Sequence, residues 1–158
     1  MQGILLLFVG KTADDRIASF LDEYVKRTQR YLRLEVKTLP EPKTTKKTPP
    51  SLQKELEGVS IIQAVEPGDE VILLDERGSE YTSPEFADLL RRRMMTVKNR
   101  LVLVVGGPYG FSGEVYRTFP QMLSLSKMTM NHQMVRMVLA EQVYRAVSII
   151  HNLPYHHD

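Results

Sequence analysis

Short apolar runs alternate with segments of helical periodicity along the whole chain, and this alternation limits the possible folds more than any other feature. A strand that is covered on both faces reads as a nearly continuous apolar run. Four runs fit that description, at Gln2–Val9, Glu70–Leu74, Leu101–Val105 and Met122–Leu125, and a weaker alternating segment, Leu34–Leu39, is typical of a further strand. A helical segment follows each run. Strands and helices in this order predict an α/β fold with a mainly parallel sheet flanked by helices.

The helical segments carry recognisable start signals. Apolar residues recur at three- and four-residue spacing from Ile17 to Thr28, and a final helix is expected from about Gln133 to Ile150. Serines suit the cap position of the other three helices, because a hydroxyl can accept a hydrogen bond from a free backbone N–H. We expect Ser51 to cap a helix to about Ala64, Ser83 to cap one that runs into an arginine cluster, and Ser112 to cap a short one before Pro120.

Length and composition restrict the class of protein further. A chain of 158 residues predicts a single domain, residues 1–158, with a sizeable core. Cysteine is absent, so disulfide frameworks, cysteine nucleophiles and thiolate metal sites are excluded. The longest apolar run, Ile4 to Val9, is six residues and too short to span a bilayer. We therefore expect a soluble, cytoplasmic protein with no membrane partner.

The distribution of charge is more informative than the net charge of +2. Residues 91–100 contain five basic residues and no acid, and residues 43–54 contain four lysines and no acid. Such clusters could contact a phosphate backbone, but they are equally typical of the solvated surface of helices and loops.

The last helix is unusually apolar, with twelve apolar residues between positions 133 and 150. A helix that is apolar around most of its circumference needs cover on two sides. A second subunit in a twofold homodimer could provide it, and burial within one compact monomer is the alternative.

Three segments that follow predicted strands could form a ligand site, because parallel sheets bind ligands at the carboxyl ends of their strands. They are residues 74–78, the glycine-rich segment 106–110, and residues 125–130. Nucleotide-binding motifs do not match: residues 106–113 contain no G-x-G-x-x-G, and Gly10-Lys11-Thr12 lacks the first glycine of a phosphate loop. Glycines that only form turns remain an alternative for each segment.

All four histidines lie between positions 132 and 157. His132 begins the predicted last helix with Arg136 one turn further on, and His156-His157 lie close to the chain end. No H-x-x-x-H pair occurs and few acids are near, so we expect no metal site. Glu141 and Arg145 have the spacing of a structural ion pair.

Several of these segments together resemble one family. They are Gly106-Gly107-Pro108-Tyr109-Gly110, residues 123–129 (LSLSKMT), His132, Arg136, Glu141, Tyr144-Arg145-Ala146 and Pro154-Tyr155-His156. In this order they resemble the RlmH family, the small SPOUT-class methyltransferases of large-subunit ribosomal RNA. The resemblance extends over the whole chain and is most specific in its C-terminal half.

The resemblance implies a SPOUT fold with a C-terminal trefoil knot, which the order of strands and helices would not predict because knotted chains are rare. It also implies a homodimer that transfers a methyl group from S-adenosylmethionine to N3 of a pseudouridine in 23S ribosomal RNA, on the assembled ribosome. The implied cofactor-binding residues fall in the three strand-end segments; they are Leu74, Gly106, Leu125, Ser126, Lys127, Met128, Thr129 and Met130.

The implied catalytic residues are His132, Arg136, Tyr155 and His156. Attack by N3 builds charge on the pyrimidine ring, so a proton acceptor or a cation near the ring would assist. Tyr155 could stack on the base, and His156 could accept the proton. In this family the tail of one subunit completes the pocket of the other, and the residue after the Tyr-His pair is basic, whereas here it is His157.

Three alternatives are compatible with the residues. An enzyme of the same fold could modify another RNA base, such as a transfer-RNA base. A protein of this fold could bind the ribosome without catalysis. A flavodoxin-like enzyme of small molecules would share the order of strands and helices, but the match over the full length disfavours it.

Overall fold

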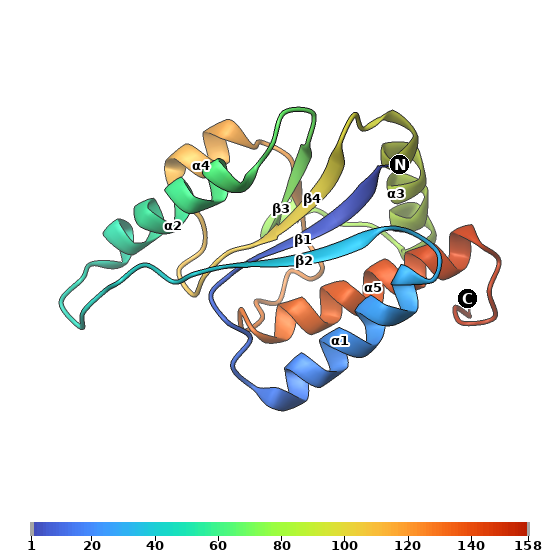
Figure 1. Cartoon of the computed structure of the whole chain (residues 1–158), viewed down its shortest axis with the longest axis horizontal. Coiled ribbons are helices and arrows are strands. Elements are labelled where there is room, and N and C mark those ends of the chain that lie inside the picture. Colours follow the sequence, from blue (N-terminus) through green and yellow to red (C-terminus); the bar gives the residue numbers. More distant parts are fainter. Residues whose placement is uncertain (1, 158) are drawn as a thin grey trace.

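The computed structural model describes residues 2–157 and shows a parallel five-stranded sheet with helices on both faces (Figure 1). The elements in chain order are β1 (Gly3–Val9), α1 (Asp15–Gln29), β2 (Leu34–Leu39), α2 (Pro50–Ala64), β3 (Glu70–Ser79), α3 (Ser83–Thr96), β4 (Arg100–Val105), α4 (Gly113–Thr118), β5 (Met122–Leu123) and α5 (Met134–Ile150). The strand order is β2-β1-β4-β3-β5, and every pair is parallel. The α/β prediction is confirmed.

Strand β1 lies inside the sheet, paired with β2 on one side and β4 on the other. Because successive side chains of a strand point to opposite faces, its apolar run supplies both layers of the core. Ile4, Leu6 and Phe8 belong to a cluster that includes residues of α1, α3 and α5. Leu5 and Leu7 belong to a second cluster with residues of α2 and α4. Figure 1 shows α2 and α4 on one side of the sheet and α1 and α5 on the other.

The predicted helix starts were right in one case and wrong in two. Ser112 caps α4 by accepting a hydrogen bond from the N–H of Val115. Ser51 is instead inside α2, which begins at Pro50. Ser83 is the first residue of α3, and Thr82 caps that helix through its hydroxyl while Glu85 bonds back to the N–H of Thr82. That reciprocal pair satisfies two backbone N–H groups at once, so it fixes the helix start one residue earlier.

Strands β3 and β5 also differ from the prediction. β3 continues five residues beyond Leu74, and β5 ends at Leu123 instead of Leu125. The extension exists because Ser79 pairs with Leu123 after an irregularity in the ladder. A Cβ added to Gly78 would lie 2.6 Å from the carbonyl carbon of Met122, so the two backbones run in close contact. His132 precedes α5 instead of beginning it.

Helix α5 is covered within its own chain to a large extent. It packs between α1 and α3, and Leu139, Ala140 and Val143 belong to the core beneath it. The monomer fold therefore accounts for much of its apolar circumference, and the homodimer stays a prediction.

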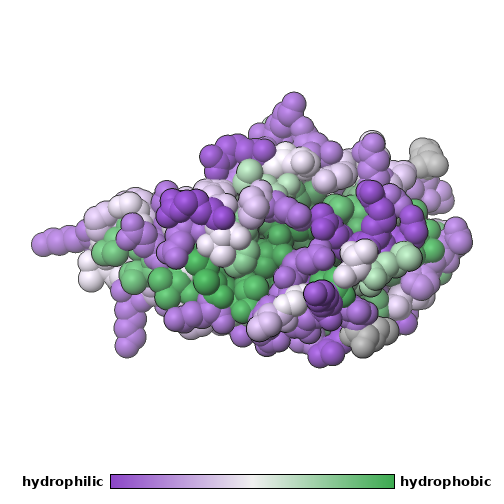
Figure 2. Space-filling model, turned by 90° about the horizontal axis from the view of Figure 1, so that it is seen from above, coloured by the Kyte–Doolittle hydropathy of each residue, from purple (hydrophilic) through white to green (hydrophobic). Residues whose placement is uncertain are grey.

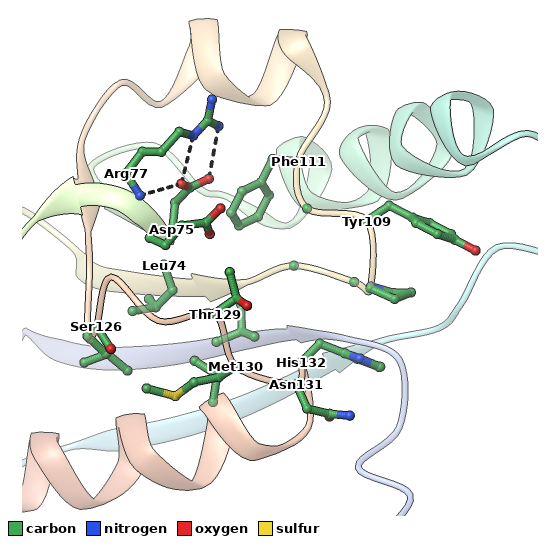
Figure 3. A pocket seen from close by; sticks show the side chains of 18 of the residues that line it. Leu74, Asp75, Arg77, Tyr109, Phe111, Ser126, Thr129, Met130, Asn131 and His132 are labelled. Atoms are coloured by element: carbon green, nitrogen blue, oxygen red, sulfur yellow. Dashed lines mark hydrogen bonds and ion pairs between the residues drawn. The ribbon is translucent and has the colours of Figure 1, made fainter.

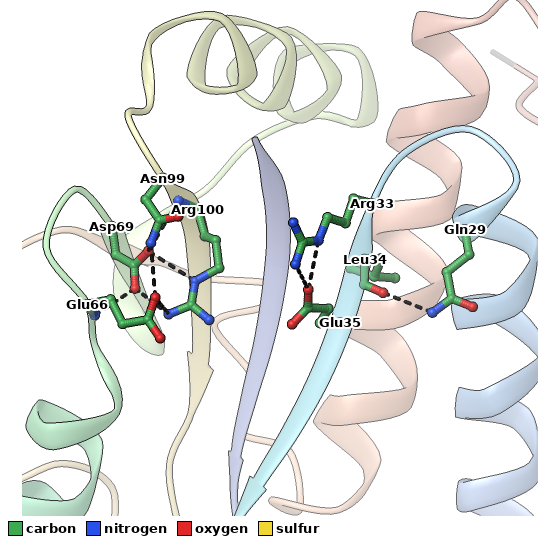
Figure 4. Close-up of polar contacts among 8 residues, drawn as sticks. All are labelled: Gln29, Arg33, Leu34, Glu35, Glu66, Asp69, Asn99 and Arg100. Atoms are coloured by element: carbon green, nitrogen blue, oxygen red, sulfur yellow. Dashed lines mark hydrogen bonds and ion pairs between the residues drawn. The ribbon is translucent and has the colours of Figure 1, made fainter. Parts of the chain in front are cut away.

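At the amino ends of the strands, a buried ion pair links β3 to β4 (Figure 4). The Asp69 side chain is fully buried and accepts hydrogen bonds from Arg100 Nη2 at 2.7 Å and from Asn99 Nδ2 at 2.8 Å. The N–H of Glu66 donates to the same carboxylate at 2.8 Å. These contacts fix the starts of two neighbouring strands, and hence the position of their opposite ends.

Helix α2 exposes apolar side chains on its outer face, namely Leu52, Leu56 and Val59. Viewed from above, apolar surface extends across the left and centre of the molecule between polar groups (Figure 2). Lys43, Lys46 and Lys47 are exposed on the loop that precedes this helix.

Candidate functional site

A cavity of about 750 Å³ lies at the carboxyl end of β4 and beside residues Leu74–Arg77, in the second half of β3 (Figure 3). Its volume is within the range of roughly 300–1,000 Å³ that is typical of ligand pockets. The three strand-end segments predicted from the sequence meet here. Of the predicted cofactor-binding residues, seven line the cavity: Leu74, Gly106, Leu125, Ser126, Met128, Thr129 and Met130.

Lys127 is the predicted cofactor residue that does not line the cavity. Its ammonium group is 3.5 Å from Glu80 Oε1, and its side chain is mostly exposed. The segment around it is ordered by short-range hydrogen bonds. Ser124 Oγ donates to the carbonyl of Ser126, and Ser126 Oγ accepts from the N–H of Met128. These bonds hold the segment against the cavity while Met128 remains 81% exposed.

The glycine loop, residues 106–110, forms a second wall. Gly110 has a φ of +81° and donates its N–H to the carbonyl of Gly107 at 3.2 Å, which closes a tight turn. A Cβ at Gly106 would lie 3.0 Å from the ring of Phe111, so a side chain here would fit only if the ring moved aside. The Tyr109 ring is half-exposed and points away from the other labelled residues in Figure 3.

An acidic side chain with two partners forms the third wall. Asp75 Oδ2 accepts hydrogen bonds from the Tyr116 hydroxyl at 2.5 Å and from Arg77 Nη2 at 3.3 Å. Burial opposes ionisation of Asp75, but the bonds from Arg77 and Tyr116 outweigh it, so the pKa of Asp75 lies below its usual value. Burial and the bond to Asp75 raise the pKa of Tyr116 to about 12. Asp75 is therefore a carboxylate at neutral pH.

His132 lies at the cavity, in the turn that leads into α5. Burial and the positive charge of Arg136 lower its pKa, although the nearby Glu41 acts in the opposite direction. Its ring is therefore mainly neutral at pH 7 and able to accept a proton.

Arg136 does not line the cavity. It is fully buried, and its guanidinium donates to the carbonyls of Val9, Gly10 and His132 at 2.7, 2.8 and 3.2 Å. The Thr12 hydroxyl accepts a further bond at 3.0 Å. The side chain thus connects the carboxyl end of β1 to the turn that carries His132.

Tyr155 and His156 lie beyond the other end of α5. The Tyr155 side chain turns back along this 17-residue helix as far as Glu141, and residues 153–157 do not line the cavity. The Tyr155 hydroxyl donates to Glu141 Oε1 at 2.9 Å and is 3.0 Å from the Tyr24 hydroxyl. Arg145 bonds Glu141 and lies 3.3 Å from His156 Nδ1. His157 is exposed, and Asp158 lies outside the described residues.

The side chains of the two predicted basic clusters have different surroundings. Arg93 pairs with Glu70 and Arg100 pairs with Asp69, while Arg91 and Arg92 both reach Asp88. Lys54, by contrast, lines the cavity. Within residues 2–157, no group of three or more histidine, aspartate or glutamate residues is arranged to hold a metal ion. In the same range, no helix is long and apolar enough to cross a membrane.

A family model described as "Predicted SPOUT methyltransferase" matches residues 2–156. The chain belongs to the SPOUT methyltransferase family. The resemblance drawn from the glycine loop and the tail is confirmed at this level.

Curated relatives of this SPOUT methyltransferase match it over nearly its full length. A protein of Bacteroides thetaiotaomicron, named "Ribosomal RNA large subunit methyltransferase H", is 46% identical over 153 residues, which are 97% of this chain and 98% of the relative. A protein of the same name from Porphyromonas gingivalis is 44% identical over 155 residues, 98% of this chain and 99% of the relative.

Solved structures show the same fold at low identity. A probable methyltransferase from Bordetella pertussis superposes with a TM-score of 0.57 at 11% identity, over 92% of this SPOUT methyltransferase and 95% of that chain. A probable methylase family protein from Haemophilus influenzae gives 0.55 at 13% identity, over 96% and 67% of the two chains. Family membership removes the flavodoxin-like small-molecule enzyme from the alternatives.

The sequence did not point to Tyr116 as a residue of the site, and it marked Lys54 only as part of a basic cluster. Tyr116 and Lys54 come from α4 and α2, so their approach to the cavity depends on how those helices pack. The place of Asp75 in the site was predictable from the local sequence, because Asp75 directly follows the apolar run of β3.

Proposed function

We propose that this SPOUT methyltransferase modifies ribosomal RNA of the large subunit, transferring the methyl group of S-adenosylmethionine to N3 of a pseudouridine in 23S ribosomal RNA on the assembled ribosome. The observation that carries the proposal is the cavity, whose walls are the three strand-end segments of the family. The names of the relatives support the choice of substrate. The protein would act in the cytoplasm, where ribosomes are assembled.

The cavity fits S-adenosylmethionine in shape and chemistry. Backbone that approaches closely at Gly106 can donate and accept hydrogen bonds along the edge of an adenine. Apolar walls from Leu74, Leu125 and Val135 suit the flat adenine ring, and the carboxylates of Asp75 and Glu76 suit a cationic ligand. Leu74, Gly106 and the segment Leu125–Met130 would hold the cofactor, with Lys127 contributing through its backbone.

Bound S-adenosylmethionine supplies a methyl group already activated by its sulfonium, so the protein mainly has to position the acceptor. His132 lines the cavity, and its neutral ring would accept the proton that leaves N3. Arg136 would act as a positioning residue, since its donors are engaged by carbonyls that fix the turn of His132.

The tail requires a second subunit if it is to reach a cavity. Residues 153–157 do not line the cavity of their own chain. In a homodimer, Tyr155 and His156 of one protomer would contact the target base at the other protomer's cavity. The bonds of Tyr155 to Glu141 and Tyr24 support this, because they fix the tail on the surface of its own chain.

The trefoil knot of the family would enclose the segment Leu125–Met130. Support comes from the close backbone contact of Gly78 with Met122 and Leu123, directly before this segment. A knot would hold the cofactor segment in place without requiring regular secondary structure in it.

Mass spectrometry of 23S ribosomal RNA from a strain that lacks the protein tests the proposal. We expect the N3-methyl group of one pseudouridine to be lost and to return on complementation. Intact methylation of every 23S pseudouridine would contradict the proposed substrate. A methyl group lost from a different RNA would indicate an enzyme of the same fold acting elsewhere, and no loss from any RNA would favour a noncatalytic binding protein.

A further inference from the structure

Glu57 of α2 is a carboxyl group buried inside the protein, with 2% of its surface exposed. Its Oε1 atom is buried and has no hydrogen-bond partner among residues 2–157. Oε2 is 3.4 Å from Gln53 Nε2, at the outer limit of a hydrogen bond. Burial, together with the negative charge of Glu41, raises the pKa of Glu57, although Gln53 acts against this. A buried carboxyl group with so few hydrogen bonds destabilises the folded state, so its presence calls for an explanation.

The carboxyl group lies directly against the glycine loop. A Cβ added to Gly107 would come 2.5 Å from Glu57 Oε2 and 2.7 Å from Oε1. The end of the Glu57 side chain therefore occupies the space that a side chain at position 107 would need. Only glycine allows the loop backbone and this carboxyl group to approach so closely.

The next residue of α2 fixes the far end of the same loop. A Cβ at Gly58 would lie 2.6 Å from Ser112 Oγ and 3.0 Å from Val115 Cγ2. Ser112 in turn caps α4. Two consecutive residues of α2 thus contact the loop at its beginning and just after its end, and they limit how far it can move away from the cavity.

The other side of this loop lines the cavity from Gly106 to Phe111. A displacement of Gly107 toward α2 would draw the loop backbone away from the ligand. Displacements of about 1 Å in a binding site can reduce activity by roughly a hundredfold. The position of the loop therefore matters to whatever occupies the cavity.

We propose that Glu57 is a positioning residue for cofactor binding: its carboxyl group supports Gly107 from beneath and holds the glycine loop in its binding shape. This inference rests on the proposed function, because it assumes that S-adenosylmethionine occupies the cavity.

Calorimetry of S-adenosylmethionine with full-length variants tests the proposal. We expect Glu57→Ala to weaken binding at least about tenfold, and Glu57→Gln, which keeps the shape of the side chain, to restore most of the affinity. Glu55→Ala is the matched control, since it removes an exposed glutamate from the same helix. In turnover assays, Glu57→Ala should raise the KM for the cofactor and leave kcat near that of the unmodified protein, which a general folding defect would not do.

A double-mutant cycle tests the contact itself. Gly107→Ala should weaken binding in the unmodified protein but much less in the Glu57→Ala background, where the added methyl group has room. Equal losses in both backgrounds, or unchanged binding by Glu57→Ala, would overturn the proposal.

Hydrogen exchange without cofactor separates this inference from the proposed function. Glu57→Ala should speed exchange of the amides in residues 106–112, and Glu55→Ala should not. Absence of S-adenosylmethionine binding by the unmodified protein would remove the proposed function. Unchanged exchange of the loop in Glu57→Ala would remove the role of Glu57, whatever ligand the cavity takes.

Discussion

Arg136 places a cation inside the protein with main-chain carbonyls, instead of a carboxylate, as its partners. Burial lowers its pKa, yet a guanidinium remains charged at any pH at which the protein folds. The ring of Phe8 lies 4.9 Å from the guanidinium carbon and adds a favourable contact. These bonds fix the backbone around His132, and a catalytic role of Arg136 stays a prediction.

Replacement of Arg136 by alanine is expected to destabilise the fold. Each buried carbonyl left without a donor costs about 1–3 kcal/mol, and three carbonyls lose their donor. Arg136→Lys should recover part of the loss, because an ammonium group keeps the charge but cannot reach every carbonyl. Urea denaturation of the three proteins checks this order, and equal stability of Arg136→Ala and the unmodified protein would contradict it.

Gly106→Val is expected to abolish binding of S-adenosylmethionine while leaving the sheet intact. The ring of Phe111 is already 3.0 Å from the position of a Cβ, so a branched side chain would displace either the ring or the loop. Calorimetry measures the binding, and far-ultraviolet circular dichroism checks the fold. Tight binding by this variant would place the cofactor elsewhere.

At the scale of elements, the sequence analysis succeeded where burial is the dominant signal. The apolar runs of β1 and β4 matched the structure within one residue at each end, because strands covered on both faces must be apolar. The bounds of β2 matched as well, but its prediction rested on alternation, and its central residues are exposed at the edge of the sheet. The meeting of three strand-end segments followed from the parallel arrangement alone. The extension of β3 to Ser79 was not predictable, since its polar residues depend on a distant pairing with β5.

The features that the sequence does not predict depend on contacts between elements that are distant in the chain. Nothing local indicates that β4 lies between β1 and β3, that Glu57 of α2 contacts the glycine loop, or that Lys54 lines the cavity. The choice of Thr82 over Ser83 as the cap of α3 did have a local signal. Glu85 lies three residues after Thr82, as a capping box requires.

The Asp69–Arg100 pair should make the stability of β3 and β4 depend on pH. Burial opposes the charge on Asp69, but bonds from Arg100 and the N–H of Glu66 lower its pKa below the usual value. The contribution of the ion pair to the free energy of unfolding is therefore complete above a pH of about 4. It is lost as the pH falls through the lowered pKa of Asp69.

Asp69→Ala is accordingly expected to lower the free energy of unfolding at pH 7 by about 3 kcal/mol, since it leaves a mostly buried arginine without its partner. The difference from the unmodified protein should shrink below pH 4. Denaturation curves at pH 7 and pH 3 provide the measurement. A difference that is constant over this range would show that Asp69 acts only by packing.

At the scale of the whole molecule, the oligomeric state is decisive, because residues 153–157 do not line the cavity of their own chain. We expect light scattering at micromolar concentration to give about twice the chain mass of 18.2 kDa. A mass of one chain under the conditions of the methylation assay would exclude a pocket shared between subunits.

Deletion of residues 155–158 should stop methylation and spare cofactor binding. Residues 153–157 do not line the cavity of their own chain, so the loss of the tail leaves the local cavity unchanged. Calorimetry and a methylation assay on ribosomes, run on the same preparation, separate the two effects. Loss of both would indicate that the bonds of Tyr155 to Glu141 and Tyr24 are needed for folding.

Because β1 lies inside the sheet, it cannot form all its strand pairings early in synthesis. This most apolar strand is made before the other strands of the sheet, but its partner β4 starts at Arg100 and is made almost a hundred residues later. Pairings between such distant segments form slowly, and an unpaired apolar strand is prone to aggregate. The nascent chain must therefore keep its first strand shielded, by its own early helices or by a chaperone, until most of the polypeptide has emerged.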